Sequence, residues 1–430
     1  MYLRSLEFER YRAFAGSEMV EIKPLTIVIG KNSSGKSALV RLPLLLEKAL
    51  SGKADGPIDL DLDGVDLGSS FEDLIHARSR RPMHLGATFG TEGRSDTFSF
   101  SAELLYVTET RSVLVLEYRV TFQGTERVCV YSGSQPPPPR GPWRYDVTTT
   151  GADDHREMDL TFSGLWPQIV SPQGGLVRLV GDESLTTELQ RAIRPRYLGP
   201  FRQVPARRYD IPGGSPRTVG THGRSAPAVL AADKIRFGGT LVGQVADWYQ
   251  KHLGGWPLDV VMNSDSFSVV VRTRDHAYPV NLVDAGAGLS QVLPIVVQRF
   301  FDQSEWAEGV IPWLEIVEQP ELHLHPAAHG AIADLYLDAI AQPGTFVMLE
   351  THSENLVLRI RRRIAEGTID PGRVALYFVD DTGGSGSTIR SVPIRPDGSV
   401  DGWPATIFSE DFEEVRAIRR ARGASQDVDP

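Results

Sequence analysis

The stretch that decides the fold is residues 25–37, LTIVIGKNSSGKS. Its last eight residues fit the pattern G-x-x-x-x-G-K-[ST], an apolar run precedes them, and the helical run ALVRLPLLLEKAL follows. Glycines let backbone N–H groups in such a loop converge on phosphate oxygens, and the N-terminus of the next helix adds positive potential. The eight residues are Gly30, Lys31, Asn32, Ser33, Ser34, Gly35, Lys36 and Ser37. The pattern therefore predicts a strand, a phosphate-binding loop for a nucleotide, and a helix from about Lys36.

Two side chains of this loop carry specific chemistry. In loops of this pattern the lysine reaches the β- and γ-phosphates, and the hydroxyl residue coordinates Mg²⁺. We therefore expect Lys36 to bind the phosphates of ATP and Ser37 to bind magnesium.

A second stretch, residues 313–321 (WLEIVEQPE), is apolar up to a carboxylate. We expect a strand that lies beside the strand before the phosphate loop, which would place Glu318 near the Mg²⁺ ion. Glu315 interrupts the apolar run and is expected to face a polar surface. The alternative is a buried strand that simply ends in charged residues.

Three histidines follow this strand: His323, His325 and His329. Two histidines four residues apart on a helix can share a face and hold zinc. No recognised metal-site motif surrounds them, so metal ligation is the weaker interpretation.

Composition limits the compartment and the partners. The chain has 430 residues, of which 41% are hydrophobic, which is enough for the cores of two or three domains. It has no run of eighteen apolar residues and no signal-peptide pattern, so we expect a cytoplasmic protein without membrane contact. Cys129 is the only cysteine, which excludes an internal disulfide and suggests a small buried residue. The net charge of −10 argues against a surface that grips nucleic acid everywhere, but it allows a local basic patch.

The order of patterns along the chain predicts an α/β fold in five parts. Short alternating segments rich in Val, Thr, Phe and Tyr indicate an antiparallel meander, and alternating strands and helices after residue 310 indicate a mainly parallel sheet. The parts are residues 1–80 (phosphate-loop part), 81–195 (meander), 196–280 (helical and linking region), 281–400 (C-terminal part of the core) and 401–430 (helix and tail). The Pro-rich loop 135–143 should be exposed, and residues 409–423 should form a short charged helix.

Four motifs along the chain resemble those of a known group of proteins. In chain order they are GKNSSGKS at 30–37, VDAGAGLSQVLP at 283–294, IVEQPELHLHP at 316–326 and LETHSENL at 349–356. Together they resemble the stand-alone bacterial ABC-type AAA-family ATPases, relatives of the RecF, SMC and OLD-type ATPases, and among them a subfamily that carries EQPELHLHP. The resemblance covers residues 1–80, 196–209 and 280–412. It implies an ABC-type fold with a mainly parallel core sheet, an antiparallel meander lobe and a helical signature region.

The resemblance also implies roles for individual residues. Residues 288–291 would be the signature segment, in which Ser290 starts a helix that points at the γ-phosphate of ATP held by another subunit. The alternative is an ordinary Gly-rich turn with a Ser cap. Residues 323–325 would cross the dimer interface, and His352 would be the switch histidine at the γ-phosphate. ATP would therefore drive formation of a homodimer or a higher homo-oligomer.

Two departures from the family pattern concern catalysis and lobe linkage. The glutamate that polarises the attacking water is replaced by Gln319, which cannot accept a proton. Either Glu321, two residues further on, takes that role, or the chain hydrolyses ATP slowly and works as an ATP-held clamp. In addition, residues 67–73 (LGSSFED) stand where the lobe-linking glutamine would be expected.

Three functional hypotheses follow. The first is a slow ATPase that acts as a dimerising switch with a separate effector, in genome maintenance or anti-phage defence. The second is a nucleotide-sensing scaffold with little hydrolysis, which Gln319 favours. The third is a RecF-like DNA clamp, which needs two arginine clusters to form one face; salt bridges to acidic residues are the plainer interpretation of them. The clusters are Arg191, Arg194, Arg196, Arg202, Arg207 and Arg208, and Arg359, Arg361, Arg362 and Arg363.

Overall fold

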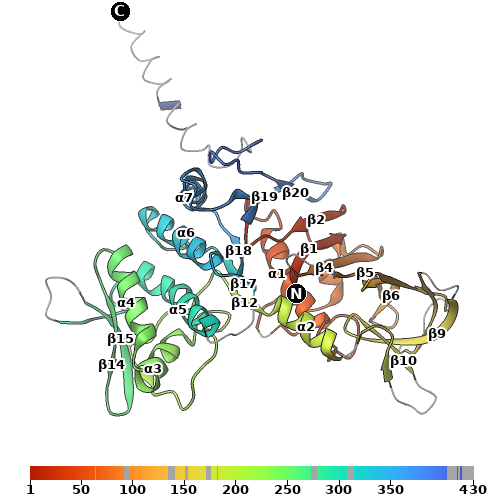
Figure 1. Cartoon of the computed structure of the whole chain (residues 1–430), viewed down its shortest axis with the longest axis horizontal. Coiled ribbons are helices and arrows are strands. Elements are labelled where there is room, and N and C mark those ends of the chain that lie inside the picture. The colour runs from red at the N-terminus through yellow and green to blue at the C-terminus, as the bar shows by residue number, and fades with distance from the viewer. Residues whose placement is uncertain are drawn as a thin grey trace, which may run out of the picture.

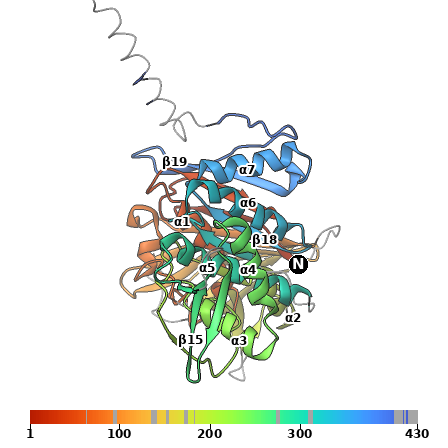
Figure 2. The same cartoon turned by 90° about the vertical axis from the view of Figure 1, so that its left-hand side faces the viewer.

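The computed structural model describes residues 1–62, 64–91, 97–133, 141–150, 154–170, 176–181, 183–272, 278–307 and 314–403, together with Glu414, Ala417 and Ile418. A central sheet separates two lobes: a β-rich lobe, and a lobe of helices with a long hairpin (Figure 1). In the view turned by 90°, the helical lobe lies in front, with α6 and α7 above it (Figure 2).

The central sheet has six strands, in the order β12-β17-β18-β3-β19-β20. The first five are parallel to one another, and the last is antiparallel to its neighbour. In chain order the elements of this part are β3 (Leu25–Gly30), α1 (Lys36–Ala49), β12 (Pro195–Leu198), β17 (Leu314–Glu318), α6 (Pro326–Ile340), β18 (Phe346–Glu350), α7 (Glu354–Ala365), β19 (Val374–Asp381) and β20 (Ser387–Ser391). The α/β class and the mainly parallel sheet are confirmed.

Apart from Thr26, strand β3 is apolar because both of its faces are buried. Val28 packs into the core that contains α1 and the β-rich lobe, whereas Ile27 and Ile29 pack into the core that contains α6 and α7. The phosphate loop therefore leaves a strand that is held between two hydrophobic cores.

The predicted meander is confirmed as an antiparallel sheet. Ten strands form one antiparallel sheet in the order β11-β10-β9-β8-β7-β6-β5-β4-β1-β2. Their bounds are β1 (Tyr2–Glu9), β2 (Glu18–Glu21), β4 (Met83–Gly90), β5 (Thr97–Val107), β6 (Ser112–Phe122), β7 (Thr125–Tyr131), β8 (Trp143–Thr149), β9 (Asp154–Ser163), β10 (Trp166–Val170) and β11 (Leu176–Arg178), followed by α2 (Glu183–Ile193). Cys129 is buried in β7, as expected for a single cysteine in a strand.

The first two strands of the chain belong to this sheet, so the β-rich lobe contains the N-terminus as well as the meander. The predicted boundary at residue 80, like the other domain boundaries, stays a prediction. Most of the Pro-rich loop 135–143 and of the helix at 409–423 lies outside the described residues.

The helical lobe contains α3 (Ala226–Arg236), α4 (Thr240–His252) and α5 (Ala287–Ala307). The helical spacing at 226–253 is divided between two helices because Gly238 and Gly239 have φ values of 77° and 78°, which an α-helix cannot contain. The remaining strands are β13 (Tyr209–Asp210), β14 (Leu258–Met262), β15 (Ser266–Val271) and β16 (Val280–Asn281), and three 3₁₀ turns are η1 (Phe71–Leu74), η2 (His76–Arg78) and η3 (Pro371–Arg373).

Two expectations about β17 are wrong. The strand does not lie beside β3, because β18 runs between them. Glu315 does not face a polar surface: it is 1% exposed, and Arg299 of α5 donates to its carboxylate at 3.2 Å. A carboxylate can be buried in a strand covered on both sides when a cation from the covering helix is paired with it.

The buried pair belongs to a larger polar cluster that predicts a pH effect on stability. Asp302 is fully buried, accepts from Gln298 at 2.6 Å and lies 3.6 Å from Arg196. Burial, and next the charge of Glu315, raise the pKa of Asp302 to about 8. The folded chain thus keeps a proton that the unfolded chain releases near pH ~4. Stability is greatest below that pH and is lost as the pH rises towards 8.

We therefore expect Asp302→Asn to flatten the decline of the melting temperature between about pH 4 and pH 8. Asparagine keeps an oxygen for Gln298 but has no proton to lose. Thermal unfolding across this range tests the prediction, with Asp265→Asn on the surface as the control. Equal pH slopes for wild type and Asp302→Asn would contradict it.

Candidate functional site

The phosphate loop has the geometry that its glycines predict. Gly35 has a φ of 99° and directly precedes α1, and a Cβ there would lie 2.8 Å from the Cβ of Ala13. Gly30 has a φ of 156°, and its added Cβ would collide with the carbonyl oxygen of Val379. Glycine is required at both positions by close packing, and at Gly35 also by the backbone conformation.

Lys36 is buried, with 3% of its surface exposed, and lies across the loop. Its Nζ donates to the carbonyl oxygen of Lys31 at 2.5 Å. Burial lowers the pKa of the ammonium, and the nearby carboxylate of Glu350 opposes this effect. The cation is therefore held at the place where a phosphate would lie.

A pocket of about 550 Å³ opens at this loop. It brings together residues that are far apart in the chain: the phosphate loop, Gln319 after β17, and His352 after β18. Its lining residues are Arg12, Ala13, Asn32, Ser33, Gly35, Lys36, Ser37, Ala38, Asp73, Ile75, Ala77, Arg78, Gln319, Glu350 and His352. Asp73 ends the segment 67–73 that the sequence placed at the lobe link, so that segment reaches the pocket.

Glu318, the predicted metal ligand, does not line this pocket. Its carboxylate is 1% exposed and accepts two bonds from Arg41, at 2.5 Å from Nε and 2.8 Å from Nη2. The Tyr197 hydroxyl donates a third bond at 2.8 Å. Arg41 lies on α1, one turn beyond Ser37, so this cation holds the carboxylate to one side of the phosphate loop.

The carboxylate that reaches Ser37 is that of Glu350. The Ser37 hydroxyl donates to Oε2 of Glu350 at 2.8 Å. Burial, and next the charge of Glu318, raise the pKa of Glu350 to about 7. Mg²⁺ in nucleotide sites takes one or two oxygen ligands from side chains and completes its shell with water and phosphate. The Ser37 hydroxyl and the Glu350 carboxylate at the start of α1 fit that requirement.

Sequence reasoning missed Glu350, although the residue ends an apolar strand as Glu318 does. That carboxylate after FVMLE was the available signal. The pairing of β18 with β3, which a sequence pattern does not reveal, makes it the carboxylate beside the loop.

The turn after β17 is tied to the end of β18. Gln319 has a φ of 46°, and its N–H donates to the Glu350 carbonyl oxygen at 2.7 Å. Oε1 of Glu321 accepts from the His352 N–H at 2.7 Å. Arg202 donates to the carbonyl oxygens of Glu318 and Gln319 at 2.8 and 3.0 Å. The backbone around the predicted catalytic residues is therefore fixed, with Gln319 on the pocket side.

Glu321 is buried, burial raises its pKa, and its Oε2 has no hydrogen-bond partner among the described residues. His352 is exposed at the pocket, yet partial burial of the ring and, second, the charge of Lys36 lower its pKa to about 4. The imidazole is thus neutral at pH 7 and can form a hydrogen bond with a phosphate oxygen.

The signature helix begins earlier than expected. α5 starts at Ala287, so Ser290 does not begin the helix, and its hydroxyl donates to the Ala287 carbonyl oxygen at 2.9 Å. The reason is Gly286: its φ of 101° ends the preceding turn, so the helix begins at the next residue, three positions before Ser290. The mostly exposed segment at the start of this helix is 283–287, which we call the tip of α5, whereas Ser290 is buried.

Two of the three histidines form hydrogen bonds with nearby residues. His325 caps α6 by accepting from the Ala327 N–H, and His329 bonds to Ser353 at 2.7 Å. Within the described ranges, no group of three or more His, Cys, Asp and Glu residues could hold a metal ion.

Most arginines of the two clusters have acidic partners. The pairs are Arg196 with Asp302, Arg207 with Asp284, Arg208 with Asp265, Arg359 and Arg363 with Asp334, and Arg362 with Glu366. Paired guanidiniums contribute little positive potential to a DNA-binding face.

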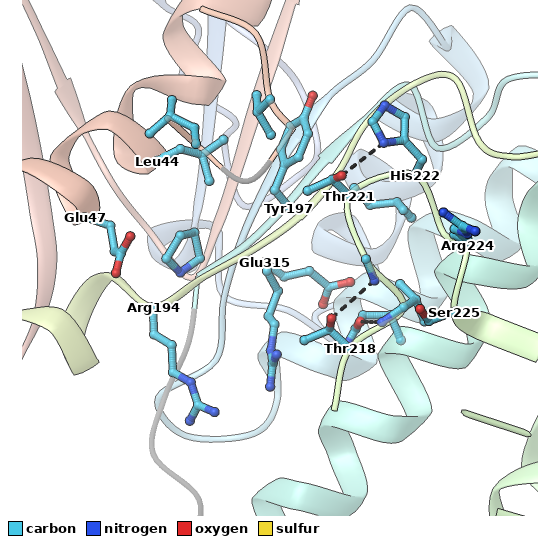
Figure 3. Close-up of a pocket in the computed structure, with 18 of the residues that line it drawn as sticks. Leu44, Glu47, Arg194, Tyr197, Thr218, Thr221, His222, Arg224, Ser225 and Glu315 are labelled. Atoms are coloured by element: carbon cyan, nitrogen blue, oxygen red, sulfur yellow. Dashed lines mark hydrogen bonds between the residues drawn. The ribbon is translucent and has the colours of Figure 1, made fainter. Parts of the chain in front are cut away.

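A second pocket of about 680 Å³ lies between the lobes. Figure 3 shows Tyr197 on its wall, between Leu44 of α1 and the loop at Thr221. Tyr197 therefore forms part of the pocket wall, while its hydroxyl donates to Glu318 at the end of β17.

None of the helices in the described parts of the chain has the length and apolar character that crossing a bilayer requires.

Comparison with known proteins gives one family and several solved structures. The family model described as "AAA domain, putative AbiEii toxin, Type IV TA system" matches residues 25–359. No curated protein matches the chain.

Solved SMC heads are similar at low identity. A SmcHead bound to the C-winged helix domain of ScpA has 13% identity and a TM-score of 0.49, covering 92% of this chain and 98% of that one. The SMC head domain from Thermotoga maritima has 10% identity and a TM-score of 0.41, covering 91% and 99%. A Smc head domain with an extended coiled coil, bound to the C-terminal domain of ScpA derived from Pyrococcus furiosus, has 10% identity and a TM-score of 0.44, covering 97% and 99%.

The family match spans more than half of the chain and includes the phosphate loop, the signature segment, the end of β17 and His352. The resemblance to AAA-family ATPases drawn from the motifs is confirmed: the chain belongs to the AAA-domain family whose model matches it.

Proposed function

We propose that this chain binds ATP with Mg²⁺, hydrolyses it slowly, and forms a homodimer when ATP is bound. One observation carries the proposal: the phosphate loop, Gln319, Glu350 and His352 line a single pocket. The family match supports it, because the matched region contains all of these residues.

Different residues of the pocket would bind different parts of Mg-ATP. Backbone N–H groups of the loop and the Lys36 ammonium would bind the phosphates, and the Ser37 hydroxyl would bind the metal. Bound Mg²⁺ would neutralise charge on the β- and γ-phosphates. Neutral His352 would orient a γ-phosphate oxygen through a hydrogen bond.

Dimerisation is supported by the surface beside the pocket. Arg202 fixes the segment 201–207 to the end of β17, and Arg207 pairs with Asp284 at the tip of α5. On this surface Phe201 is 79% exposed and Val204 is 72% exposed. Exposed aromatic and aliphatic side chains next to a helix N-terminus are what a second copy would cover, while the helix N-terminus approaches the ATP of that copy.

We expect Ala287→Glu to prevent ATP-driven association without weakening nucleotide binding by the monomer. The substitution puts a negative charge at the exposed start of α5, which suits the helix dipole but would repel a partner's γ-phosphate. Light scattering with Mg²⁺ and a slowly hydrolysed ATP analogue measures the effect, and Ser264→Glu at the exposed hairpin turn is the matched control. Association equal to wild type, or a dimer that forms without nucleotide, would refute ATP-driven pairing through this tip.

The scaffold hypothesis keeps one specific observation in its favour, because Gln319 lines the pocket where a base is needed. The DNA-clamp hypothesis gains no support from the paired arginines.

We place the switch in genome maintenance or anti-phage defence, with a separate effector, as the motif resemblance implies. A nuclease or toxin encoded beside this gene and co-purifying with the protein would support that role.

A further inference from the structure

We propose that Glu350, and not Glu318, supplies the carboxylate oxygen to Mg²⁺ at the phosphate loop, while Arg41 and Tyr197 hold Glu318 away from the metal. This inference rests on the proposed ATPase function and specifies its metal site.

The first argument is contact. Glu350 lines the pocket together with Lys36 and Ser37, and its Oε2 lies 2.8 Å from the Ser37 hydroxyl oxygen. A metal bound to that hydroxyl would find the Glu350 carboxylate as its neighbour. Glu318 does not line the pocket.

The second argument is the position of the backbone. Glu350 pairs with Val28 of β3, so the end of β18 is fixed directly beside the strand that enters the loop. The Thr351 N–H donates to the Val28 carbonyl oxygen at 3.1 Å, and the Gln319 N–H donates to that of Glu350 at 2.7 Å. The backbone at Glu350 is therefore anchored from both neighbouring strands.

The third argument is that Glu318 is already used. It receives two hydrogen bonds from Arg41 and one from Tyr197, and the Arg41 guanidinium lies 5.8 Å from the centre of the Tyr197 ring. Turning Glu318 towards the metal would leave the partly buried Arg41 without its carboxylate.

The fourth argument is charge balance. Glu318 and Glu350 are register partners on adjacent parallel strands, so two carboxylates lie side by side. Arg41 compensates one of them. The Lys36 charge acts on the other, Glu350, and a divalent cation at Ser37 would add to this compensation when Lys36 binds phosphate.

The test compares Glu350→Gln with Glu318→Gln, two substitutions of the same shape and the same charge change. Mn²⁺ replaces Mg²⁺, and electron paramagnetic resonance measures how much free Mn²⁺ remains when the protein is mixed with Mn²⁺ and ADP. ADP binding in EDTA is measured in parallel by calorimetry. We expect Glu350→Gln to weaken Mn²⁺ binding by at least about tenfold, as loss of a charge-assisted ligand predicts, with ADP affinity in EDTA unchanged.

We expect Glu318→Gln to change Mn²⁺ binding by less than about threefold and to lower the melting temperature, since one buried partner of Arg41 loses its charge. The assignment would be overturned if Glu318→Gln lowered the affinity for Mn²⁺ more than Glu350→Gln does, or if both variants lowered it equally. If Glu350→Gln does not fold, Glu350→Asp decides: it retracts the carboxylate by one methylene and should still weaken Mn²⁺ binding more than Glu318→Gln does. A wild-type chain that binds no ADP with or without metal would instead refute the proposed function.

Discussion

Lys36→Ala is expected to abolish tight binding of Mg-ATP. The Lys36 ammonium is buried in the loop and donates to the Lys31 carbonyl oxygen at 2.5 Å. On binding it would exchange that neutral partner for β- and γ-phosphate oxygens. Each charge-assisted hydrogen bond contributes about 1.5–3 kcal/mol, so loss of two of them weakens binding by at least roughly a hundredfold.

Titration calorimetry with Mg-ATP and a slowly hydrolysed analogue measures the change. Lys53→Ala, which removes an exposed lysine after α1, is the control for charge and should bind as wild type does. Lys36→Met keeps the buried volume and separates a loss of charge from a packing defect. Unchanged affinity in a folded Lys36 variant would disprove the assignment of the phosphate loop.

The parts of the site that were predicted correctly are those that depend only on consecutive residues of the sequence. The loop from Gly30 to Ser37 needs only a strand, glycines and a helix in sequence, and α1 begins at Lys36 as expected. The meander and the helices after Pro326 and Ser353 follow equally from local periodicity and caps. Such features are encoded by neighbours in the chain, so a single sequence reveals them.

The parts that were missed depend on contacts between distant segments. Ser37 and Glu350 meet across 313 positions of sequence, and Arg41 and Glu318 meet across 277. Whether β17 or β18 lies next to β3 decides which carboxylate faces the loop, and both strands are short, mostly apolar and end in a glutamate. Glu315 looked exposed for the same reason, because its cationic partner lies on α5.

The start of the signature helix was a different kind of error. Its position came from the family pattern, whereas Gly286 with its left-handed backbone marks the boundary at Ala287. A glycine directly before a helical run was a local signal that could have placed the boundary.

The second large effect concerns the base. Gln319 lines the pocket on a backbone fixed by the Glu350 carbonyl oxygen and by Arg202, but its amide cannot take a proton from water. Glu321 has one oxygen bonded to the His352 N–H and a second, buried oxygen without a partner among the described residues. Glu321 does not line the pocket, so it can act as the base only if its carboxylate moves towards the γ-phosphate.

A general base contributes about 10²–10⁴-fold to rate. We therefore expect slow turnover in the wild type and a rise of at least about tenfold in Gln319→Glu, since that substitution puts a carboxylate into the pocket on the same backbone. If Glu321 is the base, Glu321→Gln lowers turnover by at least about tenfold, although its amide oxygen can still accept from the His352 N–H. Steady-state phosphate release from the three proteins measures both effects, with Glu366→Gln on the surface as the control.

The scaffold hypothesis predicts negligible wild-type turnover and no effect of Glu321→Gln. Fast wild-type hydrolysis that is insensitive to Glu321 would refute the slow switch and the scaffold together, and would require a different base in this pocket.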